Sequence, residues 1–128
     1  VKYFYSDSNK NVTFKTDVES IKIPIDIAIP LGIVINELIS NSYKHAFLDN
    51  YKGEISIKIF EKNREKISIT FSDNGIGKKK DIDGKKSLGL NIVFEIIEKQ
   101  LHGKISYQVK NGVAYFIEVP VNLYDKRI

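Results

Sequence analysis

Residues 54–60 and 66–72 alternate apolar and polar side chains with a period of two. Successive side chains of a strand point to opposite faces, so this alternation predicts two strands with one face against a core. The charged EKNREK segment should form the turn between them. Residues 105–109 and 113–119 predict a second hairpin, because the Asn111-Gly112 dipeptide between them is a strong signal for a two-residue turn. The two hairpins indicate a mixed, mostly antiparallel sheet.

Two other segments repeat apolar residues at helical spacing. The first begins at Asp26, the expected N-cap, has Pro30 in its first turn and continues to about Phe47. The second spans residues 88–101 and should end at His102-Gly103. Helices packed on one face of such a sheet predict the α+β class, here as a two-layer α/β sandwich.

The rest of the chain gives weaker signals. Short alternating runs in residues 1–23 predict two or three short strands, whereas residues 73–87 have glycines and charges without periodicity and predict a loop. No repeat or linker divides the chain, so residues 1–128 are expected to form a single domain, which suits a length of 128 residues. Because the sequence contains no methionine, we expect a fragment of a longer protein.

Composition narrows the function classes. With 42% hydrophobic and 28% charged residues, the chain has ordinary globular usage. No apolar run in the sequence approaches the roughly 20 residues that cross a bilayer, and there is no cysteine, so we expect a cytoplasmic domain that is not inserted in a membrane. The net charge of +4 comes from lysines spread along the chain without interleaved aromatic residues, so we expect no nucleic-acid partner.

The first predicted helix has an unusual polar stripe. On a helical wheel, Glu37, Asn41, Lys44 and His45 share the arc opposite the apolar one, which is made of Leu31, Ile35, Leu38, Ile39, Ser42 and Ala46. A solvated face is one interpretation, but asparagine and histidine are poor helix formers that such a face would not favour. An acid, a neutral oxygen ligand and a base one turn apart also suit a site for metal and phosphate. The helix by itself leaves both interpretations open.

Two glycine-containing segments add to this pattern. The sequence Asp73-Asn74-Gly75-Ile76-Gly77 directly follows a predicted strand, where the carboxylate can accept a hydrogen bond while the backbone approaches a flat ligand. Ser87-Leu88-Gly89-Leu90 opens the second helix, where free N–H groups favour an anion. Each segment alone could be an ordinary turn or a packing glycine. The specific feature is the order of the segments: the polar helix, a strand, the Asp73–Gly77 segment, and then a glycine at the start of the second helix.

At this point the sequence resembles the superfamily of ATPases and kinases that includes DNA gyrase, heat-shock chaperones, histidine kinases and mismatch-repair proteins, which share the Bergerat ATP-binding fold. PLGIVINELISNSYKHAF resembles the asparagine box, DNGIG the first glycine box and SLGLNIV the second. Residues 102–120 resemble the closing hairpin. The resemblance is strongest to one subgroup of histidine kinases. It implies the ATP-binding catalytic domain of a sensor histidine kinase.

The resemblance implies a role for each matching residue. Asp73 would accept the exocyclic amine of adenine, and Asn41 would offer its side-chain oxygen to Mg²⁺. Lys44 would pair with a phosphate, His45 would lie beside the nucleotide, and Glu37 stands where hydrolytic relatives keep a general base. Further contacts to ATP are implied for Gly75, Ile76, Gly77, Ser87, Leu88, Gly89 and Leu90.

Two positions depart from the family pattern. Ser87 stands where the second glycine box often begins with glycine, and Gly112-Val113 replaces a common Gly-Thr pair. A threonine hydroxyl that would help to bind adenine through water is therefore missing, which implies a modest affinity.

The implied reaction is transfer of the ATP γ-phosphoryl to a histidine on a separate dimerisation domain, with a response regulator as a later partner. The isolated chain should not label itself, because neither His45 nor His102 is a credible acceptor. The alternatives are a self-contained ATPase in which Glu37 activates water, a serine kinase of the anti-sigma-factor type, and a degenerate nucleotide-binding domain. A helical hairpin with an exposed histidine upstream of this chain would decide among them.

Overall fold

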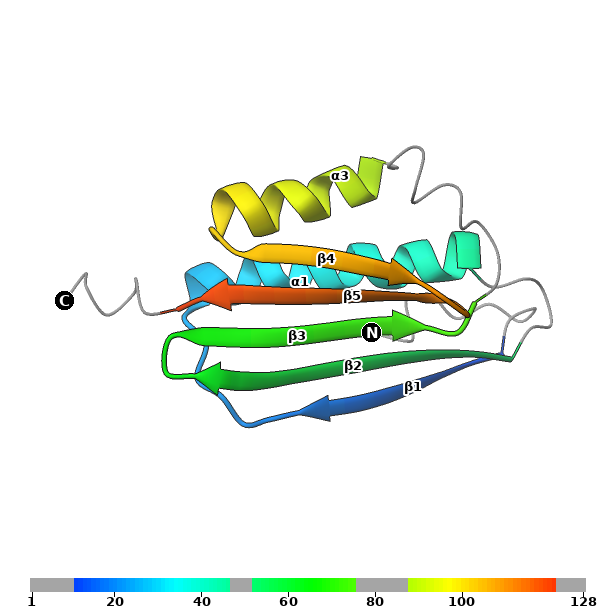
Figure 1. Cartoon of the computed structure of the whole chain (residues 1–128), viewed down its shortest axis with the longest axis horizontal. Coiled ribbons are helices and arrows are strands. Elements are labelled where there is room, and N and C mark those ends of the chain that lie inside the picture. Colours follow the sequence, from blue (N-terminus) through cyan, green and yellow to red (C-terminus); the bar gives the residue numbers. More distant parts are fainter. Residues whose placement is uncertain (1–10, 47–51, 76–87, 122–128) are drawn as a thin grey trace.

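A computed structural model describes residues 11–46, 52–75 and 88–121. They form a five-stranded sheet with the strand order β1-β2-β3-β5-β4 (Figure 1). β1 pairs with β2 in parallel, whereas the other three neighbouring pairs are antiparallel, which confirms the mixed, mostly antiparallel sheet. The strands are β1 (Asn11–Val18), β2 (Lys52–Asn63), β3 (Lys66–Asp73), β4 (Lys104–Val109) and β5 (Val113–Pro120).

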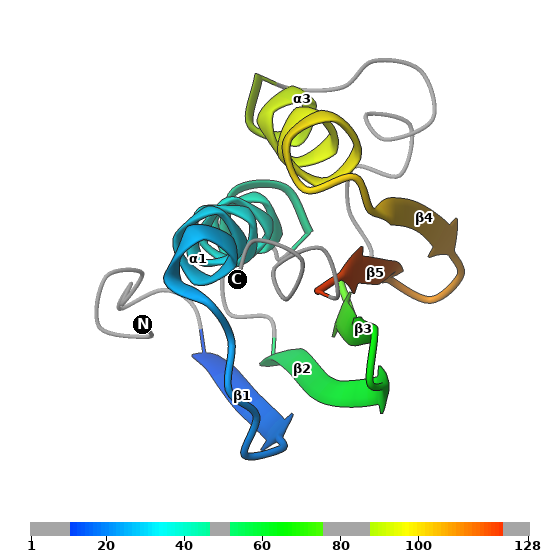
Figure 2. The same cartoon turned by 90° about the vertical axis from the view of Figure 1, so that its left-hand side faces the viewer.

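Two helical segments cover the same face of this sheet (Figure 2). α1 (Ile25–Asn41) continues into a π-helical turn, η2 (Ser42–Ala46). α3 (Leu88–Phe94) continues in the same way into η3 (Glu95–Gln100). The expected two-layer α+β arrangement is therefore confirmed.

The start of α1 differs from the sequence expectation. The N-cap is Pro24, whose carbonyl oxygen accepts hydrogen bonds from the N–H groups of Ile27 and Ala28 at 2.9 and 2.8 Å, and no side chain caps the helix. Asp26 instead lies in the first turn, where a carboxylate still interacts favourably with the helix dipole. Because α1 already begins at Ile25, Pro30 lies inside the helix and not in its first turn.

The strand boundaries also differ from those expected. β2 extends to Asn63, past an irregularity after Glu61, and β3 begins at Lys66, so only Arg64 and Glu65 of the charged segment form the turn. Of the two or three strands expected in residues 1–23, the structure contains β1, and residues 1–10 lie outside the described residues. After the N–H of Glu19 donates to the Ile59 carbonyl oxygen at 2.9 Å, the chain leaves the sheet edge to enter α1, so residues 19–24 form no strand.

The core lies between the sheet and the two helices. Val34, Leu38 and Ile39 of α1 are almost fully buried there, together with Phe71 of β3 and Ile97 of η3. In length and composition, Ile25–Lys44 also qualifies as a possible membrane span, contrary to the expectation from the sequence. The apolar side of α1 is already used in this core, as in the core helix of a globular domain.

The predicted helix end at His102-Gly103 and the predicted hairpin at Asn111-Gly112 are both confirmed, although the loop between β4 and β5 has three residues, 110–112, and not two. His102 has a φ of 57° after η3, and the N–H of Gly103 donates to the Ile97 carbonyl oxygen at 2.7 Å, which closes the helix end. Asn111 and Gly112 have φ values of 53° and 119° in the turn between β4 and β5.

Candidate functional site

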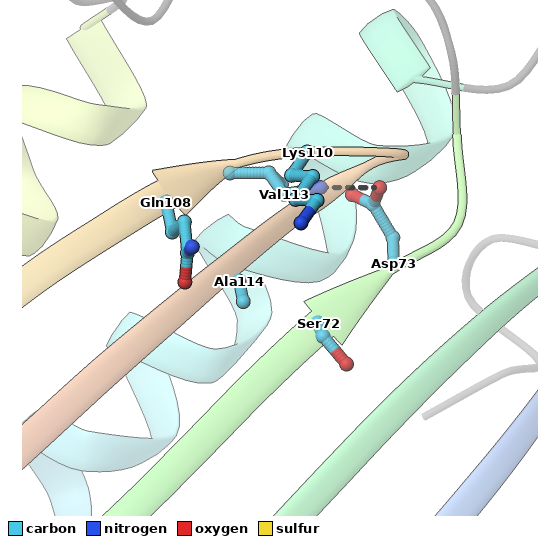
Figure 3. Close-up of a pocket in the computed structure, with 6 residues that line it drawn as sticks. All are labelled: Ser72, Asp73, Gln108, Lys110, Val113 and Ala114. Carbon is cyan, nitrogen blue, oxygen red and sulfur yellow. Dashed lines mark hydrogen bonds between the residues drawn. The ribbon is translucent and has the colours of Figure 1, made fainter.

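Asp73 is the last residue of β3, and only 7% of its surface is exposed. Its Oδ2 accepts a hydrogen bond from the Ser42 hydroxyl of η2 at 2.7 Å. Its Oδ1 accepts one from the N–H of Gly75 at 3.0 Å and one from the N–H of Val113 at 3.4 Å, the latter drawn in Figure 3. Three separate parts of the chain therefore fix the orientation of this carboxylate.

Two opposing effects act on the pKa of Asp73. Burial raises the pKa of its carboxyl group, and the hydrogen bonds from Ser42, Gly75 and Val113 lower it, with burial the larger effect. Burial also raises the pKa of the neighbouring Tyr115 hydroxyl, and the charge of Asp73 adds to that rise. A buried carboxylate that keeps a raised pKa is typical of functional sites.

The loop that carries Asp73 is tied to its neighbours on both sides. The Asn74 side-chain oxygen accepts from the N–H of Glu54 on β2 at 2.7 Å. On the other side, the hairpin turn lies directly against Asp73, because a Cβ added to Gly112 would come within 2.0 Å of the Asp73 carbonyl oxygen. Glycine at 112 is thus required both by its positive φ and by this close approach.

Glu37 and Asn41 of α1 lie opposite Gly89 in the first turn of α3. A Cβ added to Gly89 would come within 2.4 Å of Glu37 Oε1 and 3.8 Å of Asn41 Oδ1. Both side chains are half-buried against α3, so a solvated face, one of the two interpretations that the sequence left open, does not describe them. Lys44, further along the stripe, is exposed.

The side-chain amide of Asn41 has an unusual environment. Its Nδ2 is buried, and among the described residues it has no hydrogen-bond partner. Since a buried donor without a partner is costly, this nitrogen suits an acceptor oxygen of a ligand, and the amide oxygen beside it is a ligand type that hard cations take.

The donor set decides what kind of metal could bind here. Within the described segments no three His, Cys, Asp or Glu side chains form a metal cluster. That is compatible with Mg²⁺, which keeps several waters and usually takes only one or two protein ligands beside substrate phosphates. Asn41, with the Glu37 carboxylate on the same side of Gly89, fits such an ion.

Several of the residues implied by the resemblance cannot be placed. Ile76, Gly77 and Ser87 lie outside the described residues, and the side chains of His45 and Leu88 are likewise not described. Leu90 is described, and its side chain is buried in the core. Any contact of Leu90 with a nucleotide would therefore have to come from its backbone.

Sequence reasoning missed Ser42, because the helical wheel groups it with the apolar arc of the first helix. Ser42 is 3% exposed and donates to Asp73, a residue 31 positions away in the sequence. A serine within an apolar arc is a usable signal, because a buried hydroxyl requires a partner. Val113, which lacks the hydroxyl of the family's usual threonine, contributes its backbone N–H.

A cavity of about 200 Å³ lies near the same end of the sheet (Figure 3). Ser72 of β3, Ala114 of β5 and Gln108 of β4 are neighbours across the sheet and line the cavity from the face opposite the helices. Asp73, Lys110 and Val113 complete the lining. The Asp73 side chain points the other way, toward Ser42 of η2. The cavity therefore shares Asp73 and Val113 with the hydrogen-bonded site, whereas Ser72, Gln108 and Ala114 lie on the other face of the sheet.

Comparison with known proteins agrees with this geometry. Residues 26–123 match the family described as "Histidine kinase-, DNA gyrase B-, and HSP90-like ATPase". The chain is 23% identical over 94 residues to blue-light-activated histidine kinase 2 of Erythrobacter litoralis, an alignment that covers 72% of this chain and 27% of that protein.

Solved structures extend the likeness to the fold. The histidine kinase domain of the Erythrobacter litoralis EL346 blue-light-activated histidine kinase superposes with a TM-score of 0.81 at 20% identity, covering 98% of this chain and 58% of that one. The catalytic domain of histidine kinase ThkA gives 0.65 at 29% identity, covering 88% and 80%. Acinetobacter baumannii histidine kinase AdeS gives 0.69 at 22% identity, covering 88% and 55%. The Bergerat-type two-layer fold expected from the sequence is thus confirmed.

Proposed function

Because this chain belongs to the family of histidine kinase-, DNA gyrase B- and HSP90-like ATPases, we propose that it is the ATP-binding catalytic domain of a histidine kinase. In this proposal it passes the ATP γ-phosphoryl to a histidine on a separate dimerisation domain. The chain spans about a quarter of its curated relative and 58% of the histidine kinase domain it resembles, which leaves room in those proteins for further segments. The observation that carries the proposal is the buried Asp73 carboxylate, which accepts hydrogen bonds from Ser42 of η2, from Gly75 and from Val113 of β5.

Asp73 supplies the specificity for the base. An ionised carboxylate only accepts hydrogen bonds, so it pairs with the exocyclic amine of adenine and not with the carbonyl oxygen that guanine has at the same position. Burial strengthens this discrimination, because water cannot reach the carboxylate to replace a hydrogen bond that the wrong base fails to make. Gly75, which is also buried and donates to Asp73, leaves room for the base to approach the backbone.

Asn41, Glu37 and Gly89 form the phosphate side of the proposed site. The Asn41 side-chain oxygen would hold Mg²⁺, which when bound neutralises charge on the phosphates. The buried Nδ2 of Asn41, which has no partner among the described residues, would donate to a phosphate oxygen. Gly89 has no side chain, and the Glu37 carboxylate occupies the space that a Cβ would fill, so α3 lies directly against Glu37 and Asn41. Lys44 is exposed at the end of the same stripe, where it can pair with a phosphate as a point charge.

The proposal extends to partners and location. The acceptor histidine would lie on the dimerisation domain of the same kinase, and a response regulator would receive the phosphoryl group from it. We propose a cytoplasmic location, which suits a chain with no cysteine.

Phosphoryl transfer tests the proposal. The chain is incubated with ATP labelled in the γ-phosphoryl group and Mg²⁺, alone and with a separately expressed dimerisation domain of the parent protein. We expect label on the histidine of that domain and none on this chain. Label on His45 or His102 would contradict the proposal. Steady phosphate release by the isolated chain, abolished in Glu37→Ala, would favour a self-contained ATPase, and label on a protein serine would favour the anti-sigma-factor type of kinase.

A further inference from the structure

We infer that Ser42 is a positioning residue for base recognition: its hydroxyl holds the Asp73 carboxylate so that a single acceptor position, on Oδ2, remains for the amine of the base. The inference rests on the proposed role of Asp73 in binding adenine and adds the residue that sets its orientation.

The hydrogen bonds of Asp73 support this assignment. A carboxylate has about four acceptor positions on its two oxygens. Oδ1 receives two backbone N–H groups, from Gly75 and Val113, so its positions are filled. Oδ2 receives the Ser42 hydroxyl alone among donors from the described residues. The remaining position is therefore on Oδ2, and its direction depends on Ser42.

The position of Ser42 argues against an incidental contact. The residue is 3% exposed and begins η2, where the α-helical turn of α1 gives way to a π-helical one. Single π-helical turns occur frequently at functional sites. The bond of 2.7 Å has the short length of a hydroxyl group donating to a carboxylate. It joins the helix layer to the end of β3, so it connects two of the elements around the proposed site.

The contact also has a consequence for pH dependence. The Ser42 hydroxyl is the first of the groups that lower the Asp73 pKa against the larger effect of burial. Binding of an amine needs the ionised carboxylate, so ATP affinity should fall as the pH decreases through the Asp73 pKa. Without the hydroxyl this pKa rises further, and the loss of affinity must occur at a higher pH.

The test uses titration calorimetry of wild type and Ser42→Ala between pH 5 and 8. Each protein is titrated with ATP and with the triphosphate of unsubstituted purine riboside, which lacks the 6-amino group. We expect Ser42→Ala to bind ATP about tenfold more weakly at pH 7 and to lose affinity at a higher pH than wild type. Affinity for the purine analogue should stay within about twofold, because it makes no bond to Asp73.

Two further variants complete the design. Ser40→Ala removes a hydroxyl two residues earlier on α1, which makes no hydrogen bond to Asp73, and should match wild type. Ser42→Cys keeps the size of the side chain with a much weaker donor, so it carries the same expectation if Ser42→Ala fails to fold.

Each outcome separates this inference from the proposed function. If wild type does not bind ATP, the proposed function fails. If wild type binds ATP but both Ser42 variants keep its affinity and pH dependence, the inference is overturned. Equal weakening of ATP and of the purine analogue would also overturn it, because that pattern indicates general damage to the domain.

Discussion

Replacing Asp73 by asparagine should change which nucleotide base is preferred while leaving the fold intact. The two backbone N–H groups at Oδ1 require an acceptor, so the asparagine carbonyl oxygen should take that position. The amide NH₂ then takes the position of Oδ2, where the Ser42 hydroxyl can rotate to accept from it. Every present partner of Asp73 therefore remains satisfied, but the free position becomes a donor in place of an acceptor.

The magnitudes follow from hydrogen-bond energies. ATP loses a bond to a charged acceptor, worth about 1.5–3 kcal/mol, so its Kd should rise roughly 10- to 150-fold. The new donor matches the carbonyl oxygen of guanine. A neutral hydrogen bond is worth about 0.5–1.5 kcal/mol, so the Kd for GTP should fall roughly 2- to 12-fold.

The effect of Asp73→Asn on stability has the opposite sign from most core substitutions. The folded-state pKa of Asp73 lies above its ordinary value, so its contribution to stability is present at low pH and is lost as the pH rises through that pKa. At pH 7 the buried charge therefore destabilises the fold, and asparagine removes it. Asp73→Asn should have a Tm at pH 7 equal to or above that of wild type, and this gain should vanish near pH 4.

Calorimetry with ATP and GTP, together with thermal unfolding at the two pH values, measures both effects. The control is Asp17→Asn, an exposed carboxylate on β1, which should change neither affinity nor Tm. Unchanged ATP affinity in Asp73→Asn would refute the role of the carboxylate in base recognition. A Tm lowered by several degrees at pH 7 would refute the reasoning about its burial.

Two further substitutions test the turn and the phosphate side. Gly112→Ala combines a positive φ with a Cβ 2.0 Å from the Asp73 carbonyl oxygen, so it should cost about 2–5 kcal/mol and lower the Tm by roughly 10–20 °C. Its control is Gly32→Ala on α1, where an added Cβ would meet no neighbouring atom within 4 Å. Thermal unfolding should show that this variant is more stable than wild type by about 0.5–1 kcal/mol. Asn41→Ala should weaken ATP binding more in Mg²⁺ than in EDTA by calorimetry; equal weakening in both would show that Asn41 does not act through the metal.

The parts of the fold that depend on local sequence were predictable. Alternation in residues 66–72 is enough to predict β3, and the turn at Asn111-Gly112 needs only the positive φ that these two residues tolerate. The parallel pairing of β1 with β2 was not predictable, because strand direction there depends on the path of α1 between them. The position of Pro30 inside α1 was missed because Pro24 begins the helix through its backbone alone.

The site was only partly predictable for a related reason. Its residue types and their order are visible in the sequence, and they are sufficient to indicate Asp73 and Asn41. A helical wheel shows one helix, however, and cannot show that α3 covers Glu37 and Asn41. Ser42 was hidden in the same way, because its partner lies on β3 and meets it only in the folded chain.

The role of Asp73 is tested most directly by a crystal structure of this chain with a non-hydrolysable ATP analogue and Mg²⁺. We expect the exocyclic amine of adenine to lie about 2.8–3.1 Å from Asp73 Oδ2, with Ser42 still donating to the same oxygen. Adenine bound elsewhere, such as in the cavity lined by Ser72 and Gln108 on the opposite face of the sheet, would contradict this assignment.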